Sequence, residues 1–418
     1  MDRRVLFAML ILLAGGATGV GVALFAFVGV DDATTEATVV WESEPAAGDD
    51  GSGAVIATVD GDPLLLRPAV ENESRVVRAT VAGTDGAAWT TPISGPDAER
   101  GGGDAAGGDD GNASEGPVAV SGLTAGTLGG DPVVALTTAP GTLVVLDADD
   151  GTVRFAVDLD GPGGLRPAIG DLTGDGNAEV ASLATDGTVR VVDGGGESVV
   201  ETSLPGEVTR RPLVVEPDAE AGERGGLAVL TNAGNPATIH MLDERGEARW
   251  TTTPSVNPLS WNAADSRDGP VIALGGANGN IQTVETSDGS GRYEVGLQDL
   301  PVEIGDADPG NVYVGGSGSV WAVDLLDGEV VWKQQYGAST RINAPGVGDV
   351  DGDGELAPVA VNRDGEVLAM TQRGRVIARG GPAEAVVYGG PLFADVTGDG
   401  GDEVIVVTDE GTAFAIDT

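Results

Sequence analysis

Three segments of this chain carry a dense run of oxygen-bearing side chains, followed by two short apolar runs. They read GDLTGDGNAEVASLATDGTVRVVD at residues 170–193, GDVDGDGELAPVAVNRDGEVLAMT at 348–371 and ADVTGDGGDEVIVVTDEGTAFAID at 394–417. Calcium is bound by such oxygens, with glycine at the sharp bend. The alternative is a plain turn, because Asp and Gly favour turns in any protein. The acids keep a fixed D-x-x-G-D-G frame, and carboxylates this close repel one another without a cation, which favours a metal site.

The three segments are copies of one structural unit. When they are aligned on their first aspartates, a proline lies four residues before each, and a turn acid followed by glycine lies fifteen residues after each. The first aspartates, prolines and turn acids are Asp171, Asp349, Asp395, Pro167, Pro345, Pro391, Asp186, Asp364 and Glu410. A spacing shared this closely indicates an internal repeat.

The rest of the chain contains weaker copies of the same unit. Past residue 36 there is almost no helical periodicity, and short β-branched runs alternate with Gly, Asp and Pro, which predicts an all-β protein. Each copy ends in an outer strand, and most copies are about 40–50 residues long, the length of one four-stranded propeller blade. The outer strands are marked by Trp41, Trp89, Phe155, Val199, Trp250, Tyr293, Trp332 and Ile377.

The two ends of the repeat region indicate how the ring closes. The last unit stops at AFAIDT and lacks an outer strand, while ATVVWESE at 37–44 resembles the outer strand EVVWKQQ at 329–335. We therefore predict a β-propeller of eight four-stranded blades over residues 37–418, closed by its N-terminal strand, which leaves no open edge there. Seven blades is the alternative, because residues 54–94 match the repeat least well. We expect residues 95–116 to form a flexible acidic insertion between blades.

The composition limits what the chain can bind. The net charge is −44, and of 22 basic residues only Lys333 is a lysine. Such a surface repels nucleic acid, since phosphate binding needs clustered cations. This excess of acidic over basic residues, with almost no lysine, resembles that of proteins from salt-loving archaea, in which high salt screens the repulsion among like charges. There is no cysteine and therefore no disulfide or thiolate chemistry.

The N-terminus predicts a membrane segment. Residues 5–30 contain no charge and would span roughly 39 Å as a helix, enough to cross a bilayer with some tilt. Arg3 and Arg4 precede the segment, and Asp31 and Asp32 follow it, so the positive-inside rule places residues 1–4 in the cytoplasm and the rest outside. We expect an uncleaved, single-pass signal anchor, a short linker at 31–36 and an extracellular propeller. A cleaved signal peptide is the alternative.

Two families share these motifs. VWAVDLLDGEVVWKQQYG at 320–337 and LVVLDADDGTVRFAVDLDG at 143–161 resemble the repeats of PQQ-like (quinoprotein-type) β-propellers. DLTGDGNAE, DVDGDGELA and DVTGDGGDE resemble the FG-GAP calcium loops of integrin-type propellers. The resemblance covers about residues 37–418. It is specific for architecture and not for function, because propellers host many unrelated tasks.

The FG-GAP resemblance implies a ligand set for each loop, with the ninth position closing the site. Side-chain oxygens in the first and third loops would come from Asp171, Thr173, Asp175, Glu179, Asp395, Thr397, Asp399 and Glu403, and backbone carbonyls from Asn177 and Gly401. The second loop offers Asp349, Asp351 and Asp353 but has Ala357 at the ninth position, so either Glu355 compensates or this site is weak. In the family such a loop joins the two inner strands of a blade, so calcium would rigidify a hairpin and have a structural role.

Other candidates for chemistry are few. His240 is the only histidine, lies in the predicted strand ATIHMLD and is expected to be a packed residue rather than a base. No Ser-His-Asp set, histidine metal cluster or Walker loop appears. The six tryptophans are expected to pack blade against blade. Four arginines, Arg166, Arg210, Arg211 and Arg341, precede or lie near innermost strands; they either line the central channel and bind an anion or, as we favour, pair with local carboxylates.

These observations lead to two functional hypotheses. The first is a membrane-anchored, calcium-stabilised, non-catalytic scaffold that binds a protein or a glycan. The second is an extracellular enzyme, either a quinone-dependent dehydrogenase or a calcium-assisted polysaccharide lyase. PQQ is not expected as a cofactor, because quinoprotein dehydrogenases of this fold are larger and many place paired cysteines at the cofactor. We favour the scaffold.

Overall fold

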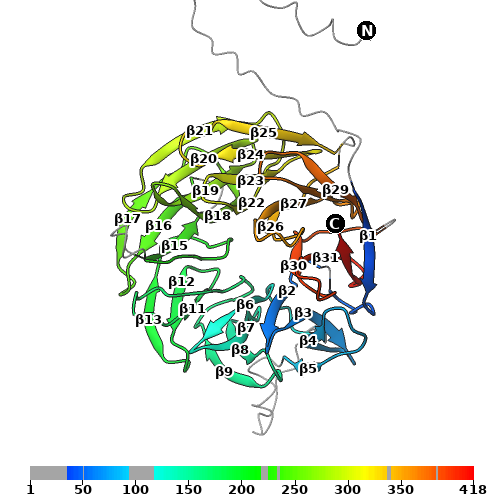
Figure 1. Ribbon diagram of the computed structural model, residues 1–418. Coiled ribbons are helices and arrows are strands. Elements are labelled where there is room, and N and C mark those ends of the chain that lie inside the picture. Colours follow the sequence, from blue (N-terminus) through cyan, green and yellow to red (C-terminus); the bar gives the residue numbers. More distant parts are fainter. Residues whose placement is uncertain are drawn as a thin grey trace, which may run out of the picture.

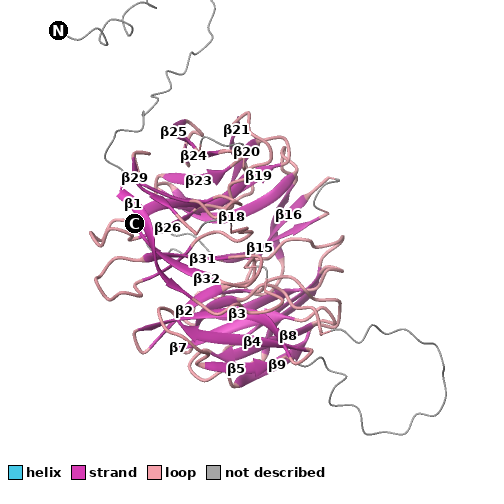
Figure 2. Ribbon diagram, turned by 90° about the vertical axis from the view of Figure 1, so that its right-hand side faces the viewer, coloured by secondary structure: helices cyan, strands magenta, loops and turns pink. Residues whose placement is uncertain are grey.

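The computed structural model describes residues 35–49, 51–93, 117–217, 225–232, 236–336, 340–382 and 385–418. Within these ranges the chain forms 32 β-strands and no helix, which confirms the all-β prediction (Figure 2). The predicted membrane segment 5–30 and the acidic insertion 95–116 lie outside the described residues. A search of the described part alone finds no helix with the length and apolarity needed to cross a membrane.

The strands form a ring of eight blades (Figure 1). Six blades are separate four-stranded sheets, and the remaining two share one eight-stranded sheet of order β26-β27-β28-β29-β1-β32-β31-β30. In each blade the strands follow one another outward from the centre of the ring. The structure thus has the eight blades expected, rather than seven. We number the blades 1 to 8 in chain order, from β2–β5 to β30–β32 with β1.

The strands of blades 1 to 4 are β2 (Val55–Val59), β3 (Asp62–Glu71), β4 (Ser74–Val81), β5 (Trp89–Pro92), β6 (Thr124–Leu128), β7 (Asp131–Thr137), β8 (Thr142–Asp147), β9 (Val153–Asp158), β10 (Ala168–Gly170), β11 (Glu179–Leu183), β12 (Thr188–Val192), β13 (Ser198–Ser203), β14 (Leu213–Val215), β15 (Gly226–Thr231), β16 (Thr238–Leu242) and β17 (Ala248–Thr252). Those of blades 5 to 8 are β18 (Pro258–Ser266), β19 (Gly269–Gly276), β20 (Asn280–Glu285), β21 (Gly291–Gly296), β22 (Glu303–Ala307), β23 (Asn311–Gly315), β24 (Ser319–Asp324), β25 (Val330–Gln335), β26 (Gly346–Gly348), β27 (Ala357–Val361), β28 (Val367–Met370), β29 (Val376–Gly380), β30 (Leu392–Ala394), β31 (Glu403–Val407), β32 (Ala413–Asp417) and β1 (Thr35–Glu42).

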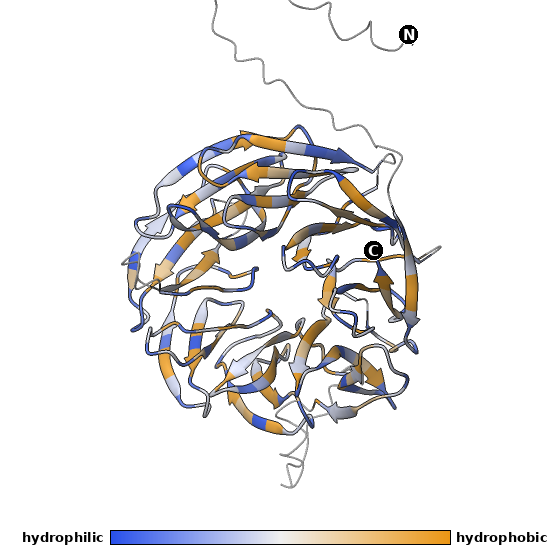
Figure 3. Cartoon of the chain, in the orientation of Figure 1, coloured by the Kyte–Doolittle hydropathy of each residue, from blue (hydrophilic) through white to orange (hydrophobic). Residues whose placement is uncertain are grey.

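The position of a strand within its blade explains its sequence. Second strands such as β11 and β31 are buried at every position, because both faces of the sheet are covered by the neighbouring blades. Outer strands such as β9 alternate between more and less exposed positions, since one of their faces meets solvent. Figure 3 shows hydrophobic segments on strands all around the ring.

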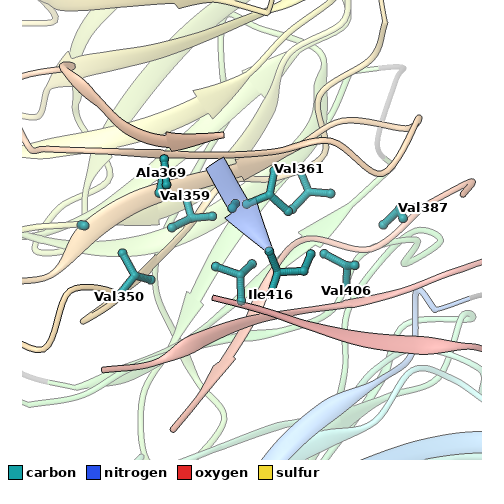
Figure 4. Close-up of a cluster of buried hydrophobic side chains, with 12 residues drawn as sticks. Val350, Val359, Val361, Ala369, Val387, Val406 and Ile416 are labelled. Carbon is teal, nitrogen blue, oxygen red and sulfur yellow. The ribbon is translucent and has the colours of Figure 1, made fainter. Parts of the chain in front are cut away.

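The hydrophobic core lies between blades rather than within one. Val359 and Val361 of blade 7 belong to one cluster with Val406 and Ile416 of blade 8, and all four are fully buried (Figure 4). Burying one such side chain contributes about 1.5–3 kcal/mol, so adjacent blades stabilise each other.

The outer strands tie each blade to the next, as expected from the sequence. All eight predicted marker residues lie on outer strands. Several rest on a glycine in a turn of the following blade: a Cβ on Gly151, for example, would fall 2.3 Å from the ring of Trp89. Indole nitrogens also donate across this boundary, from Trp89 to the carbonyl of Ala148 at 2.9 Å, from Trp250 to that of Thr286 at 2.9 Å and from Trp332 to that of Gln372 at 2.8 Å. The expected role of these tryptophans in blade packing is confirmed.

The ring closes through β1. This strand pairs antiparallel with β32, which confirms that the N-terminal strand completes the last blade. Its first residues also pair in parallel with β29, from Thr35↔Ala378 to Ala37↔Gly380, which the sequence did not suggest. A register irregularity between Val39 and Trp41 accompanies the crossing from one blade to the other. Both otherwise open sheet edges are therefore covered.

Candidate metal centre

The three acidic loops occupy equivalent places in the ring. They connect the first strand to the second in blades 3, 7 and 8, between β10 and β11, β26 and β27, and β30 and β31. Both glycines of each D-x-x-G-D-G frame have positive φ, from 67° at Gly352 to 97° at Gly400, a region that disfavours other L-residues. The frame is therefore a backbone requirement of this loop as well as a source of carboxylates.

In the first loop, Asp171 and Asp175 organise the turn. The two carboxylate oxygens of Asp171 accept hydrogen bonds from the backbone N–H of Gly174 at 2.6 Å and of Gly176 at 2.9 Å. Asp175 accepts from the backbone N–H of Asn177 at 2.8 Å. One oxygen each of Asp171, Asp175 and Glu179 lies within 4.8 Å of the others. The structure thus brings three of the predicted ligands together.

Glu179 is the buried member of this group. It is 4% exposed, and its Oε2 accepts hydrogen bonds from the backbone N–H of Leu172 at 2.9 Å and of Thr173 at 3.2 Å. The Thr173 hydroxyl donates to Oε1 at 3.3 Å, so Glu179 also locks the base of the loop. Burial raises the pKa of Glu179; the two backbone donors oppose this rise, and the charges of Asp175 and Asp171 add to it. A cation among these oxygens would relieve that repulsion.

The third loop repeats these hydrogen bonds. Asp395 accepts from the backbone N–H of Gly398 at 2.6 Å and of Gly400 at 3.1 Å, and Asp399 accepts from that of Gly401 at 3.0 Å. Glu403 takes the place of Glu179 in this loop. Its carboxylate accepts hydrogen bonds from the backbone N–H of Val396 at 2.7 Å, the backbone N–H of Thr397 at 3.3 Å and the Thr397 hydroxyl at 2.8 Å. Among the described residues, its carboxylates do not form a group within 4.8 Å like that of the first loop.

The second loop gathers a different set. Asp349, Asp351 and Asp353 each place an oxygen within 4.8 Å of the others. Partial desolvation first, and the charge of Asp353 next, raise the pKa of Asp351. Ala357 fills the ninth position and is 6% exposed, and Glu355 is exposed and outside the group. This loop therefore lacks the buried glutamate that anchors the other two.

A residue that the sequence analysis missed connects the second and third loops. The backbone N–H of Asp402 donates to the Asp349 carbonyl at 2.7 Å, and the Asp349 N–H donates to the Asp402 carboxylate at 3.1 Å. Burial raises the pKa of Asp402, with a contribution from the charges of Asp349 and Asp395. The extra acid in VTGDGGDE was a visible signal, but its partner Asp349 lies on the preceding blade.

The donor set suits a hard cation. It consists of carboxylate, hydroxyl and amide oxygens, which are the ligands that Ca²⁺ takes in groups of six to eight. The hydroxyls of Thr173 and Thr397 are bonded to Glu179 and Glu403, so their first role is to hold those carboxylates. The fit is best for the first loop, where three carboxylates converge and one of them belongs to the buried Glu179.

His240 is a packed residue, as expected. It is 6% exposed, and its Nε2 lies 3.0 Å from the Thr231 hydroxyl on the neighbouring strand β15. Burial lowers the pKa of His240 and favours its neutral form.

The fold and its repeats define the class of this protein, an eight-bladed β-propeller built from PQQ-like repeats. The chain belongs to the family described as outer membrane protein assembly factor BamB, whose pattern matches residues 185–418, more than half of the chain.

Three solved structures illustrate the likeness. BamB from Moraxella catarrhalis is 15% identical, with 91% of this chain and 100% of that chain covered and a TM-score of 0.58. The computationally designed Ika8 protein is 16% identical, with 89% and 98% covered and a TM-score of 0.61. The C-terminal WD40 domain of Sif2 is 10% identical, with 92% and 99% covered and a TM-score of 0.63. At such identities the likeness concerns the fold alone. No curated protein matches the chain.

Proposed function

We propose that this chain is a non-catalytic scaffold, a calcium-stabilised propeller that presents a rigid surface to a protein partner. Family membership supports the protein partner, because the family description names an assembly factor. The observation that carries the calcium part is the convergence of Asp171, Asp175 and Glu179 in a loop whose frame recurs in blades 7 and 8. The integrin-type resemblance of the loops points to the same role.

The proposal also covers the cellular localisation of the protein. Residues 5–30 would anchor the chain in the cell membrane, with the propeller on the outer side, as the uncharged stretch and the preceding arginines indicate. The acidic, lysine-poor surface would suit a high-salt medium, where screening limits repulsion among 66 acidic side chains. Protease accessibility of the propeller on intact cells tests the orientation, and digestion only after lysis would contradict it.

The calcium part is tested by thermal unfolding of the full-length chain in high salt, first with EGTA and then across a calcium titration. Binding at one hundred times Kd stabilises the folded state by about 2.7 kcal/mol per site. We expect a saturable rise in Tm that is strongly reduced in the double variant Asp175→Ala/Asp399→Ala, in which only the second loop keeps all of its carboxylates.

The matched control is Asp150→Ala/Asp288→Ala. It removes the same charge from two exposed Asp-Gly turns, where each aspartate accepts hydrogen bonds from the residue two positions further along the chain. The control should keep the calcium response. No response of the wild type at millimolar calcium would mean that the acidic loops are turns of an acidic surface.

The partner is tested separately, by cross-linking the chain on intact cells and comparing untreated with glycosidase-treated samples by mass spectrometry. Cross-linked species that survive glycosidase and contain peptides of a second protein joined to this chain support a protein partner. Species that glycosidase abolishes and that contain no second protein would show that the partner is a glycan.

A further inference from the structure

A cavity of about 290 Å³ lies at the centre of the ring. Its lining comes from innermost strands, or the segments just before them, in seven of the blades, around the middle of Figure 1. Most of the lining is small or apolar, and it includes five glycines, among them Gly389 and Gly390 before β30 and Gly51 before β2. The polar side chains that matter here are Arg166, Arg211, Asn262 and Asp306.

Arg166 has no carboxylate partner within the described ranges. It precedes β10, and its one hydrogen bond there is a long one, 3.5 Å from a terminal nitrogen to the Ala54 carbonyl. The side chain fits because a neighbour is glycine: a Cβ on Gly122 would lie 3.0 Å from the Arg166 Nε. The fold therefore makes room for this guanidinium at the cavity without neutralising it.

Arg211 is held in position by uncharged groups. A terminal nitrogen donates to the Asn262 amide oxygen at 2.9 Å, and the Asn262 amide nitrogen donates to the Gly305 carbonyl at 3.1 Å. The Trp261 indole nitrogen donates to the Arg211 carbonyl at 3.1 Å and fixes the backbone. Burial lowers the pKa of Arg211, and the negative charge of Asp306 partly offsets this.

The charge balance of the cavity is opposite to that of the protein. Two guanidiniums face one carboxylate, Asp306, so the lining carries a net charge of about +1, whereas the whole chain carries −44. Burial and then the charge of Arg211 lower the pKa of Arg166 to about 10. Asp306 is open to solvent in the channel, yet enough protein surrounds it that desolvation raises its pKa. Both arginines remain charged at neutral pH, and their repulsion is not fully compensated.

Several other arginines of this chain do pair with carboxylates. Arg154 lies 2.6 Å from Asp131, Arg190 lies 2.7 Å from Asp160, and Arg341 pairs with Glu303. With 66 acidic and 22 basic side chains, carboxylates are in threefold excess. Our expectation of local pairing thus holds for Arg341, whereas Arg166 is left facing the cavity.

We propose that the centre of the ring binds a small oxyanion between the guanidiniums of Arg166 and Arg211. A guanidinium offers parallel N–H donors that match a carboxylate, sulfate or phosphate group. The cavity volume is near the lower end for ligand pockets, so the ligand is an inorganic oxyanion or a small organic acid. Asp306 keeps the net charge low, which favours a singly charged carboxylate over a dianion. This site is independent of the calcium loops and of any protein partner.

Isothermal titration calorimetry on the full-length chain tests this site, with acetate, sulfate and phosphate as separate probes at constant ionic strength and a chloride series as reference. We expect saturable binding at the centre with acetate tightest, since a carboxylate needs no second positive charge. Tighter binding of sulfate or phosphate than of acetate would support the site, but would show that its ligand is an inorganic oxyanion.

Arg166→Gln should weaken the binding of the tightest probe at least tenfold. Arg166→Lys keeps the positive charge but lacks the parallel N–H donors of the guanidinium, and it should weaken binding less. Arg341→Gln is the matched control, because its guanidinium already pairs with Glu303, and it should bind like the wild type. Unchanged Tm values verify the fold of each variant. If no probe binds the wild type more tightly than chloride, or if Arg166→Gln and Arg166→Lys both bind as the wild type does, the proposal is wrong.

Discussion

Blades 2 and 3 link their first and second strands in different ways. In blade 2, Leu128 pairs with Asp131 across a tight turn formed by Gly129 and Gly130, both with positive φ. In blade 3, Gly170 pairs with Glu179 across the acidic loop of residues 171–178. The two hairpins are equivalent in topology, yet one is closed by backbone alone and the other by carboxylates.

The difference extends into the sheets. The first strands of the loop-bearing blades, β10, β26 and β30, have 3 residues each, as does β14 of blade 4, whereas β6 has 5 and β18 has 9. In the loop-bearing blade 3, side chains of Asp171 and Glu179 add hydrogen bonds that the short backbone ladder does not supply. The stability of these blades therefore depends on the ionisation of the loop and on any cation bound to it.

The largest effect is expected from removing the buried glutamate. Glu179→Ala leaves the backbone N–H groups of Leu172 and Thr173 without their acceptor, and should lower the free energy of unfolding by about 2–3 kcal/mol even in EGTA. Chemical unfolding in EGTA measures this loss. The control is Glu197→Ala, an exposed turn acid on the same blade. An equal effect of the two variants would show that Glu179 does not anchor the loop.

A loop exchange tests the comparison itself. Replacing residues 171–178 with Gly-Gly copies the blade 2 hairpin onto the equivalent pair Gly170↔Glu179. We expect the blade to keep its strands while the calcium-dependent stabilisation of this site, about 2.7 kcal/mol at a hundredfold excess over Kd, disappears. Differential scanning calorimetry with and without calcium measures it. A full calcium response in the exchanged protein would place the cation elsewhere.

The second loop can be changed in the opposite direction. Ala357→Glu supplies the missing ninth ligand, and should tighten calcium binding at this loop by about tenfold, because a further carboxylate raises the affinity of an oxygen site. Ala357→Gln has nearly the same size without the charge, and separates ligation from crowding at this buried position. Calcium titration of the three proteins gives the answer. Equal affinities for the Glu and Gln variants would argue against ligation.

The smallest effect concerns a core group outside any loop. Burial lowers the pKa of His240, so the unfolded chain binds the proton more readily than the folded one. The stabilisation is complete above about pH 6.5, the ordinary pKa, and is lost as the pH falls through the lower folded value. Urea unfolding between pH 7.5 and pH 5 should show a steeper loss for the wild type than for His240→Gln. Parallel profiles would mean that the loops alone set the pH response.

Local sequence was sufficient for much of this structure. The repeat spacing predicted the eight outer strands from Trp41 to Ile377, and the missing last strand predicted the closure through β1. The D-x-x-G-D-G frame predicted where the acidic loops lie, because its glycines are required by the local backbone conformation. The strands and the acidic loops depend on neighbours within one blade, so their signals are contiguous in the chain, whereas the closure was inferred by comparing the two ends of the repeat region.

Other contacts between blades, apart from the packing of the outer-strand tryptophans, were not visible in this way. The bond between Asp402 and Asp349, the parallel pairing of β1 with β29 and the approach of Arg211 to Arg166 all join residues from different repeats. Such contacts depend on the number of blades and on how tightly the ring closes. The sequence by itself determined the repeat, the strands and the acidic loops. Only the tertiary structure decided which charges meet at the centre and at the blade boundaries, because ring closure alone brings distant repeats within reach.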